Sequence, residues 1–205
     1  VWPMIYFVIF VLVVFASVRS FEIINGASLS DPNFGPPKEF TERYDRHPIL
    51  SLIHMVTGIL FVLLAPLQFS AKFRTRNLTL HRWMGRVLMS AGLVAGVSGI
   101  LAGLWLPAFG GFSTLLASWF FGLAIIGCFL RSFWCARNRI IQPHREWIMR
   151  AFAIGLGVGT QRVLIFIFMP FQLAPFGELF GATLWLGIAI NLLITEIWIN
   201  VTRKR

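Results

Sequence analysis

The sequence is poor in charged residues and poorer still in acidic ones. Of its 205 residues, 13% are charged and 57% hydrophobic, and 8 Asp and Glu stand against 18 Lys and Arg. A soluble domain carries about 25% charged residues. The stretch from Val87 to Leu130 contains no Asp, Glu, Lys or Arg at all. These shortages exclude an ordinary soluble globular domain and leave the lipid bilayer as the solvent for most of the chain.

Cysteine and the common catalytic motifs are also scarce. The two cysteines, Cys128 and Cys135, would share one face of a helix but lie too far apart along it to form a disulfide. We expect both to be reduced and structural. The nucleophile motifs G-x-S-x-G and H-E-x-x-H and a phosphate-binding loop are missing. Hydrolase or ATPase chemistry is therefore not expected in this chain.

Apolar runs predict an all-α, polytopic membrane bundle. The uncharged run at 87–130 is long enough for two spans of about 20 residues each. The segment 106–111 divides it, because it contains a proline and a glycine pair. Six spanning helices are predicted: 1–19, 49–69, from about 81 to that turn, 112–134, 144–170 and 179–201. A signal peptide would resemble the first run, but this run has no basic start, and we interpret it as a helix.

The positions of the basic residues predict the orientation. The connections at 70–80 and 131–143 and the C-terminus are rich in Lys and Arg, whereas 106–111 and 171–178 have none. Because such residues collect on the cytoplasmic side, both termini are predicted to be cytoplasmic. Residues 20–48 then form an extracytoplasmic loop, and 49–205 a five-helix core. The net charge is +10, and the basic residues lie in loops between apolar runs. We therefore expect them to bind anionic lipid headgroups at the cytoplasmic face and not nucleic acid.

Two predicted helix starts repeat one pattern. Residues 79–86 and 142–150 each contain His, Arg, an aromatic residue, Met and a second Arg, in that order. An N-terminal helix turn beside Arg attracts anions. If the two helices are neighbours, their imidazole and guanidinium groups converge at one depth. The same residues also suit a simple interfacial anchor, with Arg reaching phosphate and Trp at the headgroups.

These and three further motifs carry a resemblance to a known family. The motifs are H-R-x-x-G-R at 81–86, H-R-x-W-x-x-R at 144–150, H-x-x-x-G at 54–58, P-x-Q-F at 66–69 and T-x-R at 160–162. Together they resemble the predicted bacterial membrane proteins grouped as domain of unknown function 2306, over residues 47 to 170. The resemblance implies a polytopic helical fold, in our interpretation in the bacterial inner membrane, and no defined activity.

Polar residues inside the spans form two candidate clusters. Ionisable groups at membrane depth are costly, so each needs a partner or a function. The outer cluster contains His47, His54 and Arg162. The inner cluster contains His81, His144, Arg82, Arg145 and Gln68.

The sharpest functional hypothesis is a b-type haem at the inner cluster. His81 and His144 would be its axial metal ligands, and Arg82 and Arg145 would meet the anionic propionates. A second haem is not expected, because only His47 is available to pair with His54. With one haem, reduction or oxidation of a quinone at the inner face is the expected chemistry.

Two other functions stay open. A non-catalytic subunit of a larger membrane complex would dock through the 20–48 loop and through helix faces rich in glycine, at 92–103 and 155–159. A small-molecule transporter would need a path joining His54 and Arg162 to both faces. No pair of broken helices at the midplane points to such a path.

Overall fold

The computed structural model describes residues 2–26, 38–105 and 109–203, and no strand occurs among them. The elements are α1 (Trp2–Asn25), α2 (Lys38–Arg46), α3 (Pro48–Phe69), α4 (Ala71–Arg76), α5 (Leu78–Trp105), α6 (Gly111–Arg137), α7 (Ile141–Phe168), the 3-10 helix η1 (Met169–Phe171) and α8 (Phe176–Thr202). In this described part, six helices are long and apolar enough to cross a membrane, namely α1, α3, α5, α6, α7 with η1, and α8. The predicted all-helical, six-span architecture is confirmed.

Two short helices lie where loops were predicted. Within the predicted loop 20–48, α2 presents Phe40 and Tyr44 one turn apart on one face. Within the basic connection, α4 begins after Ser70, whose Oγ accepts a hydrogen bond of 3.3 Å from the backbone N–H of Phe73. Neither helix has the length that a hydropathy pattern needs, which explains why neither was predicted.

The first span is longer than predicted. Helix α1 continues to Asn25, beyond the expected end at residue 19. Arg19 and Glu22 lie one turn apart within it, and Arg19 Nη1 is 2.8 Å from Glu22 Oε2. Because these opposite charges meet on one helix face, the helix can carry them without ending. The remainder of the predicted loop, residues 27–37, lies outside the described residues.

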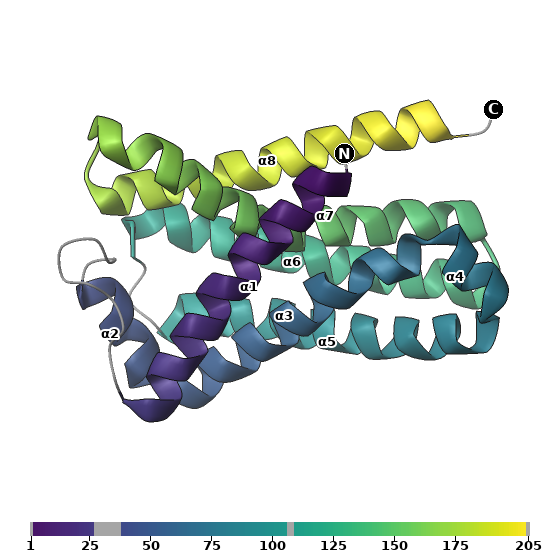
Figure 1. Cartoon of the computed structure of the whole chain (residues 1–205), viewed down its shortest axis with the longest axis horizontal. Helices are drawn as coiled ribbons and strands as arrows, with labels where there is room; N and C mark the ends of the chain where they lie inside the picture. The colour runs from purple at the N-terminus through teal and green to yellow at the C-terminus, as the bar shows by residue number, and fades with distance from the viewer. Residues whose placement is uncertain (1, 27–37, 106–108, 204–205) are drawn as a thin grey trace.

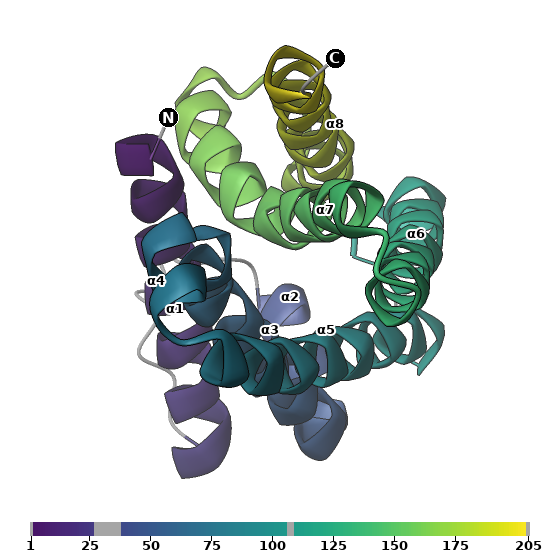
Figure 2. The ribbon, with the colours of Figure 1, turned by 90° about the vertical axis from the view of Figure 1, so that its right-hand side faces the viewer.

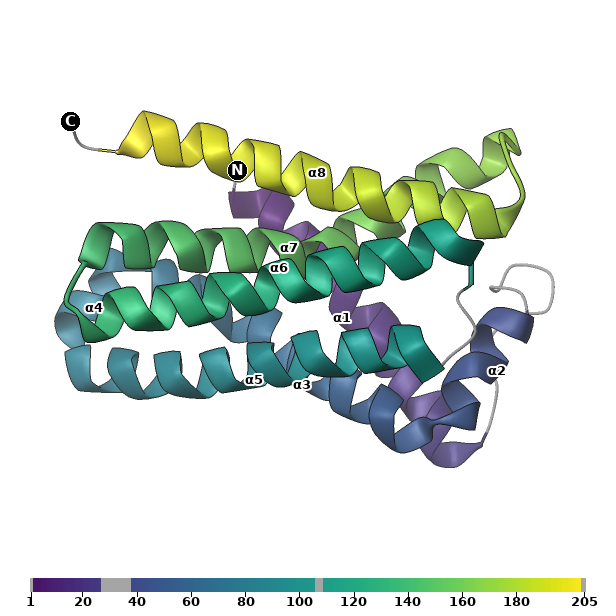
Figure 3. The ribbon, with the colours of Figure 1, turned by 180° about the vertical axis from the view of Figure 1, so that it is seen from behind.

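The helices form a ring with one helix outside it. Neighbours in contact around the ring are α1, α3, α5, α6 and α7, and α7 closes the ring onto α1. Helix α1 (purple) runs obliquely across the bundle, while α8 packs on the outside against α7 and α6 (Figure 1). Figure 2 views the bundle from the end at which α4 lies, and Figure 3 shows α5, α6 and α8 side by side from behind. We call this end the α4 end and the opposite one the α2 end.

Glycines allow the backbones to approach closely, as their spacing predicted. A Cβ on Gly159 of α7 would lie 2.9 Å from the carbonyl oxygen of Val8 on α1. A Cβ on Gly187 of α8 would lie 2.9 Å from the backbone nitrogen of Gln161 on α7. Such distances leave no room for any side chain. Helix α7 therefore packs backbone to backbone against both α1 and α8.

Candidate functional site

The two inner histidines occupy equivalent positions in their helices. The backbone N–H of His81 donates to the carbonyl of Asn77 at 2.9 Å, and that of His144 donates to the carbonyl of Ile140 at 3.2 Å. Each histidine is therefore the fourth residue of its helix, α5 or α7. Thr79, the first residue of the repeated pattern at 79–86, is the second residue of α5. The repeated motif thus has the same helical register in both copies.

His144 is held by α6 in one orientation. Its Nδ1 lies 3.0 Å from the carbonyl oxygen of Ser132 and 2.9 Å from the hydroxyl of the same residue. A carbonyl oxygen can only accept a hydrogen bond, so Nδ1 carries the proton. The neutral ring then has its lone pair on Nε2. Ser132 is fully buried, which fixes this arrangement within the packed bundle.

His81 and Gln68 leave polar atoms unsatisfied. Within the described part of the chain, His81 Nδ1 and Gln68 Nε2 are buried and have no hydrogen-bond partner. Gln68 reaches α5, because its Oε1 lies 3.7 Å from where a Cβ on Gly85 would be. Gly85 is one turn after His81 on the same face. Buried polar atoms without partners are rare and mark this place as one that a ligand could complete.

The structure places the predicted inner residues at the α4 end, although α5 and α7 are not neighbours in the ring, where α6 lies between them. His81 lies within electrostatic range of His144, Arg82 and Arg74. Arg82 and Arg145 are exposed, beside the two histidines in sequence. In the ranges 2–26, 38–105 and 109–203, no group of three His, Cys, Asp or Glu residues could hold a metal ion. The protein side of an inner metal site would therefore consist of two imidazoles.

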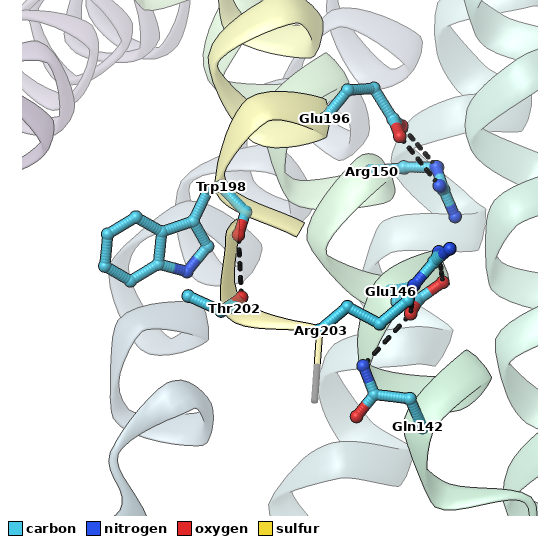
Figure 4. A network of polar contacts seen from close by, with 7 residues as sticks. All are labelled: Gln142, Glu146, Arg150, Glu196, Trp198, Thr202 and Arg203. Carbon is cyan, nitrogen blue, oxygen red and sulfur yellow. Dashed lines mark hydrogen bonds and ion pairs between the residues drawn. The ribbon is translucent and has the colours of Figure 1, made fainter. Parts of the chain in front are cut away.

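The second arginine of the α7 motif has a structural role. Arg150 donates from Nη2 to Glu196 Oε2 at 2.9 Å, and Arg203 donates from Nη2 to Glu146 Oε2 at 2.7 Å (Figure 4). Gln142 adds a hydrogen bond of 3.0 Å to Glu146. Both ion pairs join α7 to α8 at the α4 end. Sequence reasoning missed them, because nothing in a sequence tells which acid on one span faces which base on another.

At the α2 end, His54 of α3 forms hydrogen bonds to α5. Its Nδ1 lies 2.9 Å from the carbonyl oxygen of Ala95 and 3.2 Å from the hydroxyl of Ser98. The carbonyl again requires the proton on Nδ1, so Nε2 of the neutral ring is a hydrogen-bond acceptor. A Cβ on Gly99 would lie 3.1 Å from His54 Cε1. The absent side chain of Gly99 provides the space that the imidazole ring needs.

A cavity of about 460 Å³ lies inside the bundle, and His54 and Arg162 both line it. The guanidinium of Arg162 lies 5.2 Å from the ring centre of Phe180 and donates to Gln161 Oε1 at 3.4 Å. His47, the third member of the predicted outer cluster, does not line the cavity. It is exposed at the start of α3, with its ring 6.3 Å from that of Trp105. The structure therefore unites only two of the three outer residues.

Two buried polar residues of this cavity were not predicted. Gln161 is 1% exposed and donates from Nε2 to the carbonyl of Phe180 at 2.8 Å. Thr114 is 5% exposed, and among the described residues its hydroxyl has no hydrogen-bond partner. Gln161 lies beside Arg162 at the unspecified position of the T-x-R motif, so the sequence pattern does not mark it. A single Thr in an apolar helix gives no signal, because most such hydroxyls bond to their own helix.

An aromatic layer lies between the two polar regions. Phe61 of α3, Phe129 of α6 and Phe152 of α7 are all buried. The ring of Phe61 is 5.2 Å from that of Phe129 and 6.3 Å from that of Phe152. On each of these helices the aromatic residue lies between the residues of the α2 end and those of the α4 end. The inner histidines and the cavity are thus separate sites.

The fold and the buried polar sites define the class. This is a polytopic α-helical integral membrane protein, surrounded by a lipid bilayer, with two internal polar regions. The model of the family described as "Predicted membrane protein (DUF2306)" matches residues 51–199, and the chain belongs to that family. The resemblance seen in the motifs is confirmed and extends through most of α8. No curated protein and no solved structure matches the chain.

Proposed function

We propose that the protein binds one b-type haem at the α4 end, with His81 and His144 as axial ligands, and carries single electrons. The carrying observation is that two histidines at equivalent helix positions lie within electrostatic range of each other. A bis-imidazole haem needs two neutral rings from facing segments. The haem would supply the one-electron chemistry.

The chemistry of the donors fits such a group. A metal-binding imidazole almost always donates its other N–H to a carbonyl or carboxylate. His144 does so, with Nδ1 3.0 Å from the Ser132 carbonyl oxygen, and its Nε2 is left to ligate. His81 departs from this pattern, because its Nδ1 is buried without a partner in the described chain. Gln68 Nε2 is also buried and unpaired there, which is a cost that an acceptor oxygen of a bound group would relieve.

The residues around the two histidines would stabilise the anionic propionates of a haem. Arg82 and Arg145 follow the two histidines directly and are exposed at the α4 end. The first turns of α5 and α7 expose backbone N–H groups at the same depth. Both features stabilise carboxylates such as haem propionates. The arginines would therefore orient the group and the imidazoles would retain it.

The test is an absorption spectrum of the protein purified from cells supplied with a haem precursor. We expect a Soret band that disappears in His81→Ala and in His144→Ala. His47→Ala is the matched control, because His47 is exposed at the start of α3, away from the inner histidines and the cavity, and it should keep the band. A colourless wild-type preparation without iron, or a band that survives both inner substitutions, would overturn the proposal.

A second candidate function is favoured by charge. Besides the ion-paired Arg203, seven arginines of the described chain are exposed at the α4 end, namely Arg76, Arg82, Arg86, Arg131, Arg137, Arg139 and Arg145. The two described acids at that end, Glu146 and Glu196, are already paired with Arg203 and Arg150. We propose that this surface binds anionic lipid headgroups, as a membrane subunit would. Replacing Arg131, Arg137 and Arg139 together by Gln should reduce the anionic lipid that copurifies, measured by mass spectrometry.

A further inference from the structure

We propose that α2 is a movable lid, which closes the cavity against the water at the α2 end and carries Phe40 as its plug. The lid controls which solutes reach the cavity from that side. It shares no residue with the inner histidines, so the inference does not depend on haem.

Helix α2 spans the end of the bundle. The ring centre of Phe40 lies 5.3 Å from that of Phe180 on α8 and 5.2 Å from that of Phe109, which precedes α6. Tyr44, one turn later on the same face, reaches α1, where the guanidinium of Arg19 lies 5.6 Å from its ring centre. Seen along the bundle, α2 lies at the far end, within the outline of the ring (Figure 2). Because Phe40 and Tyr44 both line the cavity, α2 forms its cover.

The two faces of α2 suit a lid. Phe40 is 8% exposed, whereas Glu42, Asp45 and Arg46 are exposed to water. A helix of nine residues is marginal by itself, so α2 depends on docking for its stability. Its polar face is already hydrated in the docked state. Undocking therefore costs free energy mainly on the apolar face, and such segments open locally more readily than a packed core.

The ion pair that holds α2 can open without leaving a bare buried charge. Arg19 Nη2 lies 2.9 Å from Asp45 Oδ1 on α2, and Arg19 Nη1 lies 2.8 Å from Glu22 Oε2 on its own helix. The side chain of Asp45 is 55% exposed, while that of Glu22 is 3% exposed. When α2 leaves, Asp45 enters water and Arg19 keeps Glu22. The large cost of an uncompensated buried charge is thus avoided.

The lid covers residues of two sequence motifs. His54 and Gly58 of H-x-x-x-G and Arg162 of T-x-R all line the cavity. The guanidinium of Arg162 lies 5.7 Å from the ring centre of Phe40. Displacement of Phe40 would therefore open a path from the water to Arg162 and the cavity. A solute could then enter without crossing the apolar part of the bilayer.

The lid is tested by the accessibility of a thiol in the cavity. Gly58→Cys supplies the thiol, because Gly58 lines the cavity and a Cβ there would have no described atom beyond its own neighbourhood within 4 Å. Cys128→Ala and Cys135→Ala remove the native thiols. The full chain is reconstituted in liposomes, and the rate of labelling by 2-sulfonatoethyl methanethiosulfonate, an anionic reagent that does not cross membranes, is measured. Leu173→Cys, at a position 69% exposed at the same end, gives the rate for unhindered access.

Three changes in α2 are compared in this background. Asp45→Asn weakens the ion pair and makes no void, since Asp45 does not line the cavity, and labelling at position 58 should become about two to five times faster. Phe40→Ala removes the plug, and labelling should become about ten times faster. Glu42→Gln is the matched control, because it changes another exposed acid of α2 and keeps the Arg19 pair, and the rate should not change.

Equal labelling rates at position 58 with and without Asp45→Asn would overturn the proposal. Acceleration in Phe40→Ala alone would indicate a void in place of a moving lid, with the same consequence. Equal acceleration by Asp45→Asn and Glu42→Gln would also overturn it. Because Asp45 is exposed, Asp45→Asn decides the question even where Phe40→Ala does not fold. The Soret band of the haem proposal should not change in any of these variants.

Discussion

At the scale of the residue, a glycine determines whether the aromatic layer can form. Phe129 is fully buried, and its ring occupies the position that a side chain on residue 92 would need. A Cβ on Gly92 would lie 2.2 Å from Phe129 Cζ and 2.5 Å from Cε2. Contacts this short do not occur in folded proteins. Gly92 is therefore required by the ring across from it, and not by a turn.

Gly92→Ala should destabilise the protein by about 1–3 kcal/mol, since the phenyl ring or the α5 backbone must move in a well-packed region. The measurement is the midpoint of thermal unfolding in detergent. Gly127→Ala is the control, because a Cβ there meets no described atom within 4 Å. If both variants melt at the same temperature, the packing argument fails.

At the scale of the element, α8 is attached to α7 in two ways. Close backbone contact at Gly157 and Gly187 joins the middle of the two helices, where a Cβ on Gly187 would lie 2.9 Å from the Gly157 carbonyl oxygen. Two ion pairs join their ends, with Arg150 19% exposed in one and Arg203 50% exposed in the other. In each pair the other partner has the opposite exposure, 41% for Glu196 and 11% for Glu146, so water screens the two pairs to a similar degree and they should contribute similarly.

Glu196→Gln removes the acid that Arg150 needs and keeps the shape of the side chain. Stability should fall by about 1–2 kcal/mol, between the values typical of exposed and of buried pairs. The comparison is Glu178→Gln, which changes an exposed acid in the first turn of the same helix. Detergent melting curves report both. A loss in Glu178→Gln as large as that in Glu196→Gln would show that the pair has no special role.

At the scale of the whole molecule, the two ends of the bundle differ in charge. The α4 end carries most of the exposed arginines, and its two described acids are already paired. Trp134 at this end lies beside Arg131, whose guanidinium is 4.5 Å from the centre of the tryptophan ring. Such Trp and Arg side chains suit the lipid headgroup layer. A bilayer with a cytoplasmic surface of anionic lipid would hold the molecule in one orientation.

This asymmetry predicts that the α4 end and the C-terminus face the cytoplasm. Green fluorescent protein fused after Arg205 should fluoresce, and alkaline phosphatase fused at the same place should be inactive. A phosphatase fusion after Phe109 should be active, because that residue lies at the α2 end. Phosphatase activity at the C-terminus would reverse the assignment.

Hydropathy and register could be predicted from the sequence because each depends on neighbours along the chain. The bilayer requires about 20 apolar residues per helix, so the six spans follow from composition alone. The shared pattern at 79–86 and 142–150 likewise placed His81 and His144 at matching helix positions, as the backbone hydrogen bonds show. The end of α1 was predicted too early, because hydropathy counts Arg19 and Glu22 as two charges and does not show that they pair with each other.

What only the tertiary structure decided is which side chains meet across helices. His47 is the non-helical residue just before α3 and His54 lies seven residues later within it, and only His54 lines the cavity, where Gly99 of α5 leaves room for its ring. The partner of Arg150, the buried hydroxyl of Thr114 and the cavity itself depend on contacts between distant segments. Helix packing is set by the shapes of both surfaces together, and a single segment contains only one of them.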